Sequence, residues 1–449
     1  MYLTIIGTLM SFLRLKSLFT KFWPYLLILC LTAVYFYFLL IDSRYFFYDD
    51  FTAFTFVVPR TYTRIIADSL ASRDIDRHKI IGYLLTKFLY HTVSTRVEMY
   101  FAALFIIHSL NSNLLFSLLR RLTRHTLTSF VLSAVFAWRF YLWWFSNIHT
   151  LLAALFSLCV VHLWLNFLSS RRFLPLALIW LISPLMIYSY GSSFFVFPAL
   201  FFLTASIYGF RNARQYLLYL SPFILLLIVY FFVYTRAPDS LTRFSMPENP
   251  YFRPISVSTF LNVQAQFLHA LNPLLPVSIP LLGLVAGALL ILTAAAAGHS
   301  FWLLAAYLTS IAPNSFFPNH TMFYYLYYPI IFLLVFIARL MRTRYWPVAL
   351  ISVIVLLNPV VNLSQIAFRL RHPAPNFEIK SIHLIDQAVT QAVKSGQTRI
   401  KLSNWEVTPN LNHAIDNQAL PLFLSGPQKD RFHYSYSRDT QILTLTPRP

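Results

Sequence analysis

Two adjacent carboxylates are the residues of this sequence whose type and spacing best suit chemistry. Asp49 and Asp50 stand in the stretch Arg44-Tyr-Phe-Phe-Tyr-Asp-Asp-Phe51, and the first 370 residues contain no other adjacent pair of acids. A carboxylate within hydrogen-bond reach of a hydroxyl group can act as its general base. The alternative is that one acid only caps a helix beginning at Phe51, but a cap needs one acid and the sequence supplies two. The spacing leaves open which acid is the base and whether the other binds a divalent metal.

The composition indicates that these acids belong to a membrane protein. Of 449 residues, 58% are hydrophobic, 18% aromatic and only 11% charged, whereas soluble domains carry about a quarter charged residues. Two cysteines, Cys30 and Cys159, both lie in apolar runs, which excludes a disulfide framework and a cysteine-based zinc site. The formal charge of +20 comes from basic residues scattered between apolar runs. This distribution favours the loops of a membrane protein over a nucleic-acid-binding surface.

Apolar runs long enough to cross a bilayer recur along the chain. They predict about eleven spans, at 22–41, 99–119, 126–145, 149–168, 173–189, 193–209, 216–234, 276–297, 300–313, 322–341 and 345–362. Lys and Arg residues fill the short loops on one side, while the turns at 146–148, 190–192 and 314–320 carry none. The positive-inside rule therefore predicts a cytoplasmic N-terminus and an extracytoplasmic C-terminal tail. With this topology every Asp and Glu falls on the outer side or at its membrane edge.

Three outer segments must then position the acids. In the first, 42–98, apolar residues at helical spacing from Ile80 to Leu89 predict a helix lying in the membrane interface, with Lys87 and His91 off the apolar stripe. The second, 235–275, carries arginines and a predicted interfacial helix at 257–271. The third is the tail, 364–449, where we expect a helix at 379–394 and strands at 398–402 and 441–445. A unit this small is expected to dock on the transmembrane region, 1–363.

Four motifs resemble one enzyme family. They are Phe47-Tyr-Asp-Asp-Phe51, the stretch from His108 through Asn111 to Arg120-Arg121-Leu122, the segment from Arg253-Pro-Ile to Asn272-Pro-Leu-Leu-Pro276, and Tyr325-Leu-Tyr-Tyr-Pro329. Together with an acid pair after the first span, they are similar to GT-C glycosyltransferases, and most closely to transmembrane O-mannosyltransferase-like proteins. The chain departs from the family where a basic residue commonly stands and it has Tyr324, and where a Lys-Glu pair is often found and it has 190–192.

The resemblance implies an all-α polytopic GT-C-like fold with a small α+β tail, and a polyprenyl-phosphate-linked sugar as donor. Asp49 and Asp50 would supply the base toward a lipid, glycan or protein acceptor. The departing phosphate needs cations and hydrogen-bond donors, and the candidates in this chain are Arg139, His149, Arg253, His320 and Tyr324.

Each phosphate candidate has a structural alternative. Arg139 has no acid in its predicted span and could instead extend to the outer headgroups. His320 stands beside Tyr324, Tyr325, Tyr327 and Tyr328, which an aromatic belt at the interface would also explain. His149 has the same two interpretations. His108 and His162 fall mid-span, and we expect them to be packing residues with satisfied hydrogen bonds.

The sequence lacks a glycine-rich phosphate loop, a His/Cys set at metal-ligand spacing and a nucleophile elbow. It therefore favours a lipid-linked donor over a nucleotide sugar. No cofactor is implied beyond the divalent metal left open above. The favoured hypothesis is a glycosyltransferase on the outer face of a bacterial inner membrane. The alternatives are a transporter or flippase of lipid-linked glycans, in which repeated halves would be expected, and a non-catalytic membrane assembly protein.

Overall fold

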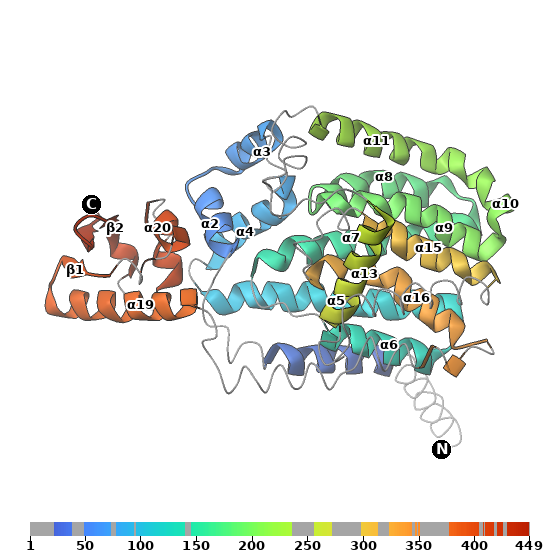
Figure 1. The fold of residues 1–449 in the computed structure, drawn as a ribbon, viewed down its shortest axis with the longest axis horizontal. Helices are drawn as coiled ribbons and strands as arrows, with labels where there is room; N and C mark the ends of the chain where they lie inside the picture. The colour runs from blue at the N-terminus through green and yellow to red at the C-terminus, as the bar shows by residue number, and fades with distance from the viewer. Residues whose placement is uncertain are drawn as a thin grey trace, which may run out of the picture.

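The computed structural model describes residues 22–37, 49–72, 78–93, 96–139, 145–235, 256–271, 298–312, 323–343, 346–347, 349–350, 377–403, 407, 409–416, 420–424 and 429–448. Most of these residues are helical (Figure 1).

The body of the molecule is a bundle of apolar helices. It consists of the helix Phe22–Tyr37 together with α5 (Val97–Thr123), α6 (Thr126–Arg139), α7 (Ile148–Ser170), α8 (Phe173–Ile187), α9 (Val196–Tyr208), α11 (Leu217–Thr235), α15 (Phe301–Ile311) and α16 (Ile330–Leu340). In the part of the chain that the structure describes, three segments are long and apolar enough to cross a bilayer: Glu98–Thr123, Ile148–Ser170 and Gly191–Tyr208. Their buried faces meet in one hydrophobic core.

Most predicted spans coincide with a helix of this bundle. The exceptions are 276–297 and most of 345–362, which lie outside the described residues, and 322–341, which is not one continuous helix. The total of about eleven crossings therefore stays a prediction.

The break in the span at 322–341 has a local cause. Residues Phe323–Leu326 form the short 3-10 helix η7, and α16 begins only after Pro329, at its N-cap position. Proline lacks a backbone N–H and clashes with the preceding turn, so it is tolerated at a helix start but not inside one. The break leaves Tyr327 and Tyr328 in a turn, where both hydroxyl groups reach neighbouring elements.

A three-helix cap covers one end of the bundle. It consists of α2 (Asp49–Val57), α3 (Tyr62–Ala71) and α4 (Ile80–Val93), and we call it the α2–α4 cap. The ring of Phe56 lies 5.0 Å from that of Tyr83 and joins α2 to α4. Helix α3 begins where the Thr61 hydroxyl accepts the Arg64 backbone N–H at 3.2 Å, a standard N-cap that stabilises the first turn.

Helix α4 is present as predicted, and its buried positions include both polar and apolar residues. They are Ile80, Gly82, Tyr83, Thr86 and Lys87. In the rest of the apolar stripe, Ile81, Leu84, Leu85 and Leu89 are partly buried against the core, whereas Phe88 is 53% exposed. Most of the stripe therefore packs on protein.

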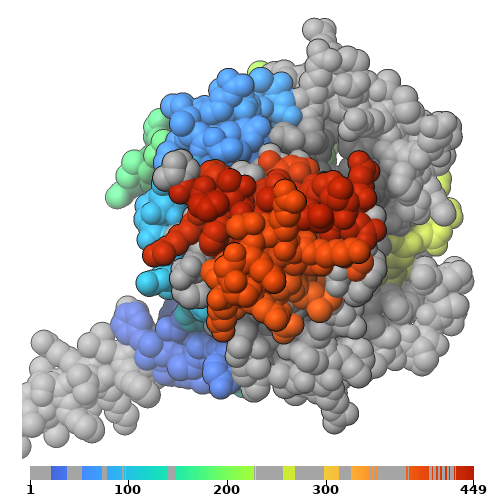
Figure 2. Space-filling model, turned by 90° about the vertical axis from the view of Figure 1, so that its left-hand side faces the viewer, coloured from blue at the N-terminus to red at the C-terminus, as the bar shows by residue number. Residues whose placement is uncertain are grey.

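The tail forms a small α+β unit. It comprises α19 (Phe377–Ser395), β1 (Arg399–Lys401), α20 (Pro409–Asp416), β2 (Phe432–Ser437) and β3 (Ile442–Pro447). The strands make one antiparallel sheet in the order β1-β3-β2, with Ile400 opposite Leu443 and Tyr434 opposite Leu445. The predicted helix and two predicted strands are present, whereas β2 was not predicted. Helix α20 packs against α2, so the tail touches the α2–α4 cap (Figure 2).

Candidate functional site at the cap

The acid pair opens a helix. Asp49 and Asp50 are the first two residues of α2, which begins two residues earlier than the predicted start at Phe51. Their backbone is described, whereas their side chains lie outside the description. An acid in the first turn of a helix is favourable, because the unpaired N–H groups and the helix dipole make that end positive. Both acids therefore stand at the positive end of a short helix.

Aromatic contacts hold α2 on the bundle. The Phe54 ring stacks against Phe145 with centroids 6.0 Å apart, and meets Tyr100 edge-on at 5.5 Å. Phe145 opens the 3-10 helix η2 (Phe145–Asn147), which leads into α7, and Tyr100 lies in the first turns of α5. Offset and edge-on aromatic pairs are stabilising beyond their buried area. The second half of α2 is therefore held against α5 and against the 3-10 helix that leads into α7.

A buried lysine secures the other end of α2. The Nζ of Lys87 donates to the Val58 carbonyl at 2.9 Å, and only 5% of this residue is exposed. Burial lowers the pKa of Lys87 below its ordinary value, because desolvation disfavours the charged form. Val58 directly follows α2, and this donor satisfies its carbonyl beyond the end of the helix.

An ion-pair triad fixes α3. Asp68 accepts from Arg60 Nε at 2.9 Å and from Arg64 Nε at 2.8 Å, and Arg60 also donates to the Phe56 carbonyl. These bonds hold the pKa of Asp68 below its ordinary value, the hydrogen bond from Arg60 being the largest cause. Asp68 is thus engaged in structure and is a poor candidate for a base.

His149 lies where the sequence predicted, in the first turn of α7, but it is enclosed by α4. Its ring is 4% exposed and packs edge-on against Tyr83 at 5.0 Å. A Cβ atom on Gly82 would come within 2.0 Å of the His149 Nδ1, so only glycine fits there. The Nδ1 atom has no hydrogen-bond partner among the described residues. The arrangement places His149 inside the joint between cap and bundle.

Lys79 is a cation at the same joint that the sequence did not single out for phosphate binding. It directly precedes α4, and its Nζ lies 6.0 Å from the centre of the Tyr190 ring. The Tyr190 ring in turn stacks on Tyr325 at 6.4 Å. The backbone N–H of Ile81 donates to the Tyr188 carbonyl at 3.0 Å, which docks the start of α4 on the end of α8. Lys79 comes close to His149 only in the folded protein, so the sequence alone did not indicate it.

Two of the sequence motifs meet inside the bundle. The Nδ1 of His108 lies 2.5 Å from the Tyr327 hydroxyl, and its Nε2 lies 2.9 Å from the Ala137 carbonyl. Since a carbonyl only accepts, Nε2 carries the proton of the neutral ring and Nδ1 accepts from Tyr327. Asn111 donates to the same hydroxyl at 3.3 Å and to the Leu151 carbonyl at 3.0 Å. The expectation that His108 is a satisfied packing residue is confirmed.

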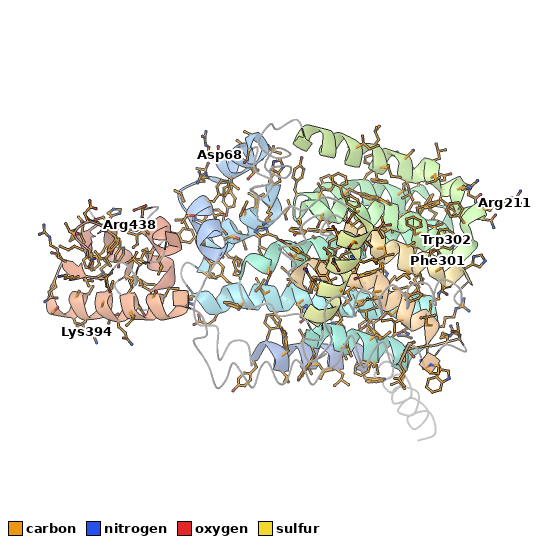
Figure 3. The ribbon with its side chains drawn as sticks, in the orientation of Figure 1. Asp68, Arg211, Phe301, Trp302, Lys394 and Arg438 are labelled. Carbon is orange, nitrogen blue, oxygen red and sulfur yellow. The ribbon has the colours of Figure 1, made fainter. Side chains whose placement is uncertain are left out.

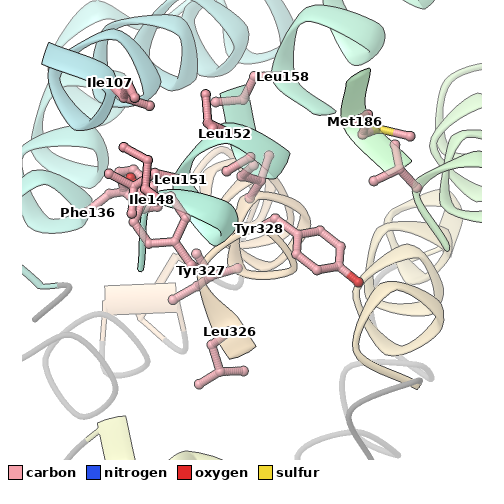
Figure 4. Packing of buried hydrophobic residues seen from close by; sticks show 14 of the residues in the cluster. Ile107, Phe136, Ile148, Leu151, Leu152, Leu158, Met186, Leu326, Tyr327 and Tyr328 are labelled. Atoms are coloured by element: carbon pink, nitrogen blue, oxygen red, sulfur yellow. The ribbon is translucent and has the colours of Figure 1, made fainter. Parts of the chain in front are cut away.

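The neighbouring tyrosine faces the other way (Figure 4). Tyr328 donates from its hydroxyl to the carbonyls of Ser192 and Ser310, at 2.7 and 2.5 Å. Tyr327 and Tyr328 are fully buried, so the aromatic-belt interpretation is wrong for these two residues. His162 also has a partner, the Leu114 carbonyl at 3.0 Å, as expected of a packing residue.

The remaining candidates are located only in part. Arg139 is the last described residue of α6 and Tyr324 lies in η7, but their side chains are outside the description. Arg253 and His320 lie outside the described residues altogether. Among the side chains that are described, no group of three or more His, Cys, Asp or Glu could hold a metal ion. The divalent metal stays a hypothesis about Asp49 and Asp50.

Comparisons with known protein families, with curated proteins and with solved structures gave no match. The joint between cap and bundle holds Lys79 before α4, with Tyr190 and Tyr325 stacked beside it. The acid pair opens α2 in the same cap.

Proposed function

We propose that this protein is a membrane glycosyltransferase that uses a polyprenyl-phosphate-linked sugar, with Asp49 and Asp50 supplying the base. The observation that carries the proposal is the position of the acid pair at the first turn of α2, a helix anchored by Phe54 on α5 and on η2, which leads into α7. An anchored helix can hold a carboxylate at a fixed distance from a bound hydroxyl group, which general-base catalysis requires.

The distribution of charge supports an outer-face reaction. Asp68 and the acids of α2 lie at the cap, whereas Arg211 lies at the opposite end of the bundle (Figure 3). The end with Arg211 also carries the arginines that follow α5, α7 and α16. By the positive-inside rule this arginine end faces the cytoplasm and the α2–α4 cap faces outward. In a bacterial inner membrane, the cap and the tail would lie in the periplasm.

Lys79, at the joint between cap and bundle, suits the leaving group. A polyprenyl phosphate carries negative charge on oxygens that accept hydrogen bonds, and release of the sugar increases that charge. Lys79 directly precedes α4, where helix N–H groups add positive potential. His149, in the first turn of α7, is buried against Gly82 of α4 and would contribute a hydrogen-bonding ring nitrogen. Phe88 of α4, 53% exposed, gives the lipid chain of the donor an apolar surface to lie against.

The test uses the full-length protein in membranes supplied with labelled polyprenyl-phosphate sugars and extracted acceptors. We expect Asp49→Asn or Asp50→Asn to abolish transfer while the protein still folds and inserts, because an amide cannot accept the proton. Asp68→Asn is the matched control. It removes a carboxylate from the same cap, but one already bound by Arg60 and Arg64.

Unchanged transfer in both acid variants would remove the catalytic assignment. A loss in all three variants that follows their loss of stability would indicate a structural role for the acids. If the unaltered protein transfers no sugar from any polyprenyl-phosphate donor, the proposed class itself is wrong.

A further inference from the structure

The end of the bundle opposite the cap is a concentrated patch of arginines. The patch consists of Arg120, Arg121, Arg124, Arg171, Arg172, Arg211, Arg214, Arg339 and Arg342. Within the described part of the chain, none of them is paired with a carboxylate, and the ion pairs present there all belong to Asp68. This end therefore holds fixed positive charge that the described residues leave without a counterion.

Two of these arginines cap a helix to which they do not belong. Arg342 follows α16 and donates from Nη1 to the carbonyl of Thr123, the last residue of α5. Arg339 donates to the Ser206 carbonyl in the last turn of α9, at 3.5 Å. Terminal carbonyls of a helix lack partners within it, and cations there also meet the negative end of its dipole. These bonds fix the guanidinium groups in place.

Arg339 and Arg342 keep unused hydrogen-bond donors after they bond these helix carbonyls. A guanidinium group has five N–H donors, and each of Arg339 and Arg342 uses one nitrogen on a carbonyl. The two residues are three apart in the chain, so they lie on neighbouring positions of one face. Arg124 directly follows the Thr123 carbonyl that Arg342 caps, and it is exposed. Arg342 and Arg124 thus lie at the end of α5, and Arg339 lies three positions before Arg342 against the end of α9, with donors that suit the oxygens of a phosphate.

Two exposed apolar side chains lie close to this group along the chain. Leu127, in the first turn of α6, is 63% exposed, and Trp346, four residues after Arg342, is 54% exposed. Tryptophan is enriched at the level of lipid headgroups, where an apolar ring can lie beside acyl chains. A free phosphate ion would gain nothing from these two side chains, whereas a phospholipid would contact both.

We propose that Arg124, Arg339 and Arg342, together with Leu127 and Trp346, form a binding site for the headgroup of an anionic phospholipid. The guanidinium groups would bind the headgroup phosphate, and Leu127 and Trp346 would contact the upper part of the acyl chains. The site differs from a general attraction to the membrane, because its cations are held in place by the ends of α5 and α9. It does not depend on the glycosyltransferase proposal.

The experiment measures the melting temperature of the full-length protein in neutral detergent. Phosphatidylglycerol, phosphatidylcholine with the same acyl chains, and inorganic phosphate are titrated separately. A ligand that binds only the folded state raises the melting temperature with its concentration. We expect phosphatidylglycerol to raise it well above the effect of phosphatidylcholine, and inorganic phosphate to leave it unchanged.

Variants distinguish a site from diffuse charge. Arg342→Gln and Arg124→Gln should each weaken the apparent affinity for phosphatidylglycerol about tenfold or more, the loss expected for one charge-assisted hydrogen bond. Arg172→Gln, an exposed arginine at the same end, is the matched control and should weaken it no more than about fivefold, the effect of one basic residue at a membrane surface.

Three results would overturn the proposal. Equal stabilisation by the two lipids would show that the charge is not recognised. Equal losses in all three variants would show that only total charge matters. A matching effect of inorganic phosphate would make this a phosphate site with no lipid preference. Arg339 is half-buried, so the test does not depend on altering it.

Discussion

His108 and Tyr327 are separated by 219 positions in the chain and share a hydrogen bond of 2.5 Å in the core of the bundle. The bond joins α5 to the turn that precedes α16, and Asn111 adds a second contact to the same hydroxyl. Both residues come from motifs that the sequence suggested independently. A buried polar junction of this kind specifies which helices pack together, since any other pairing leaves its groups without partners.

The junction can be tested by a double-mutant cycle. Tyr327→Phe removes the hydroxyl, and His108→Gln can keep a donor for the Ala137 carbonyl while losing the acceptor for Tyr327. Each change should cost roughly 1–3 kcal/mol of unfolding free energy, because a buried group loses its partner. The double variant should cost less than the sum, since both changes remove one bond. The unfolding free energy of the unaltered protein, both single variants and the double variant is measured on purified protein in detergent.

Tyr328→Phe provides the control for that cycle. Its hydroxyl donates to the Ser192 and Ser310 carbonyls and does not touch His108. Its effect should therefore add to that of His108→Gln within a few tenths of a kcal/mol. Additivity in the Tyr327 cycle as well would contradict the hydrogen bond.

Gly82→Ala should loosen the joint between the cap and the bundle. The added methyl group would lie 2.0 Å from the His149 Nδ1, so α4 or the histidine must move. Overpacking of this kind costs roughly 1–3 kcal/mol. Limited proteolysis and thermal unfolding should both reveal the loss. The double variant Gly82→Ala with His149→Ala should recover much of the stability, and no recovery would mean that the clash is not the cause.

The Asp68 triad predicts a defined dependence on pH. The pKa of Asp68 in the folded protein is lowered from 3.8, mainly by the hydrogen bond from Arg60. A lowered carboxylate pKa contributes stability that is present above the ordinary pKa and is lost as the pH falls through the folded value. The unaltered protein should therefore melt at a higher temperature than Asp68→Asn at neutral pH. This difference should shrink below about pH 4, and a constant difference down to strongly acidic pH would exclude the triad as its source.

Lys87→Met should release the end of α2. The methionine side chain has a similar length but no donor, so the Val58 carbonyl is left unpaired at a cost of roughly 1–3 kcal/mol. Hydrogen exchange in α2 should become faster while exchange in α7 is unchanged. Lys394→Met, at an exposed position of α19, is the control and should leave both helices unaffected. If α2 exchanges at its original rate, Lys87 does not hold it.

The sequence predicted helices better than it predicted what they face. Apolar runs located most bundle helices, because crossing a bilayer imposes a length that is visible in composition. The stripe from Ile80 to Leu89 predicted α4 correctly, but a stripe does not reveal whether it meets protein or lipid. That choice depends on partners far away in the chain, such as His149 against Gly82.

Three misses had signals in the sequence. Pro329 marked the break before α16. Thr61 with the Arg64–Asp68 spacing marked α3, whose N-cap and ion pair depend on residues three and four apart. The alternation of Phe432, Tyr434 and Tyr436 with polar residues marked β2. Contacts such as that of His108 with Tyr327 had no signal of this kind, because spacing along one chain carries no information about a partner more than 200 residues away.

The ends of two early helices depend on arginines that are synthesised late. The carbonyls that end α5 and α9 receive their donors from Arg342 and Arg339, which are synthesised long after both helices. A nascent chain that stops before these positions therefore has early helices whose last carbonyl groups lack these arginine donors. Chains truncated ahead of Arg339 should be removed by quality-control proteases, even though they contain most of the apolar segments.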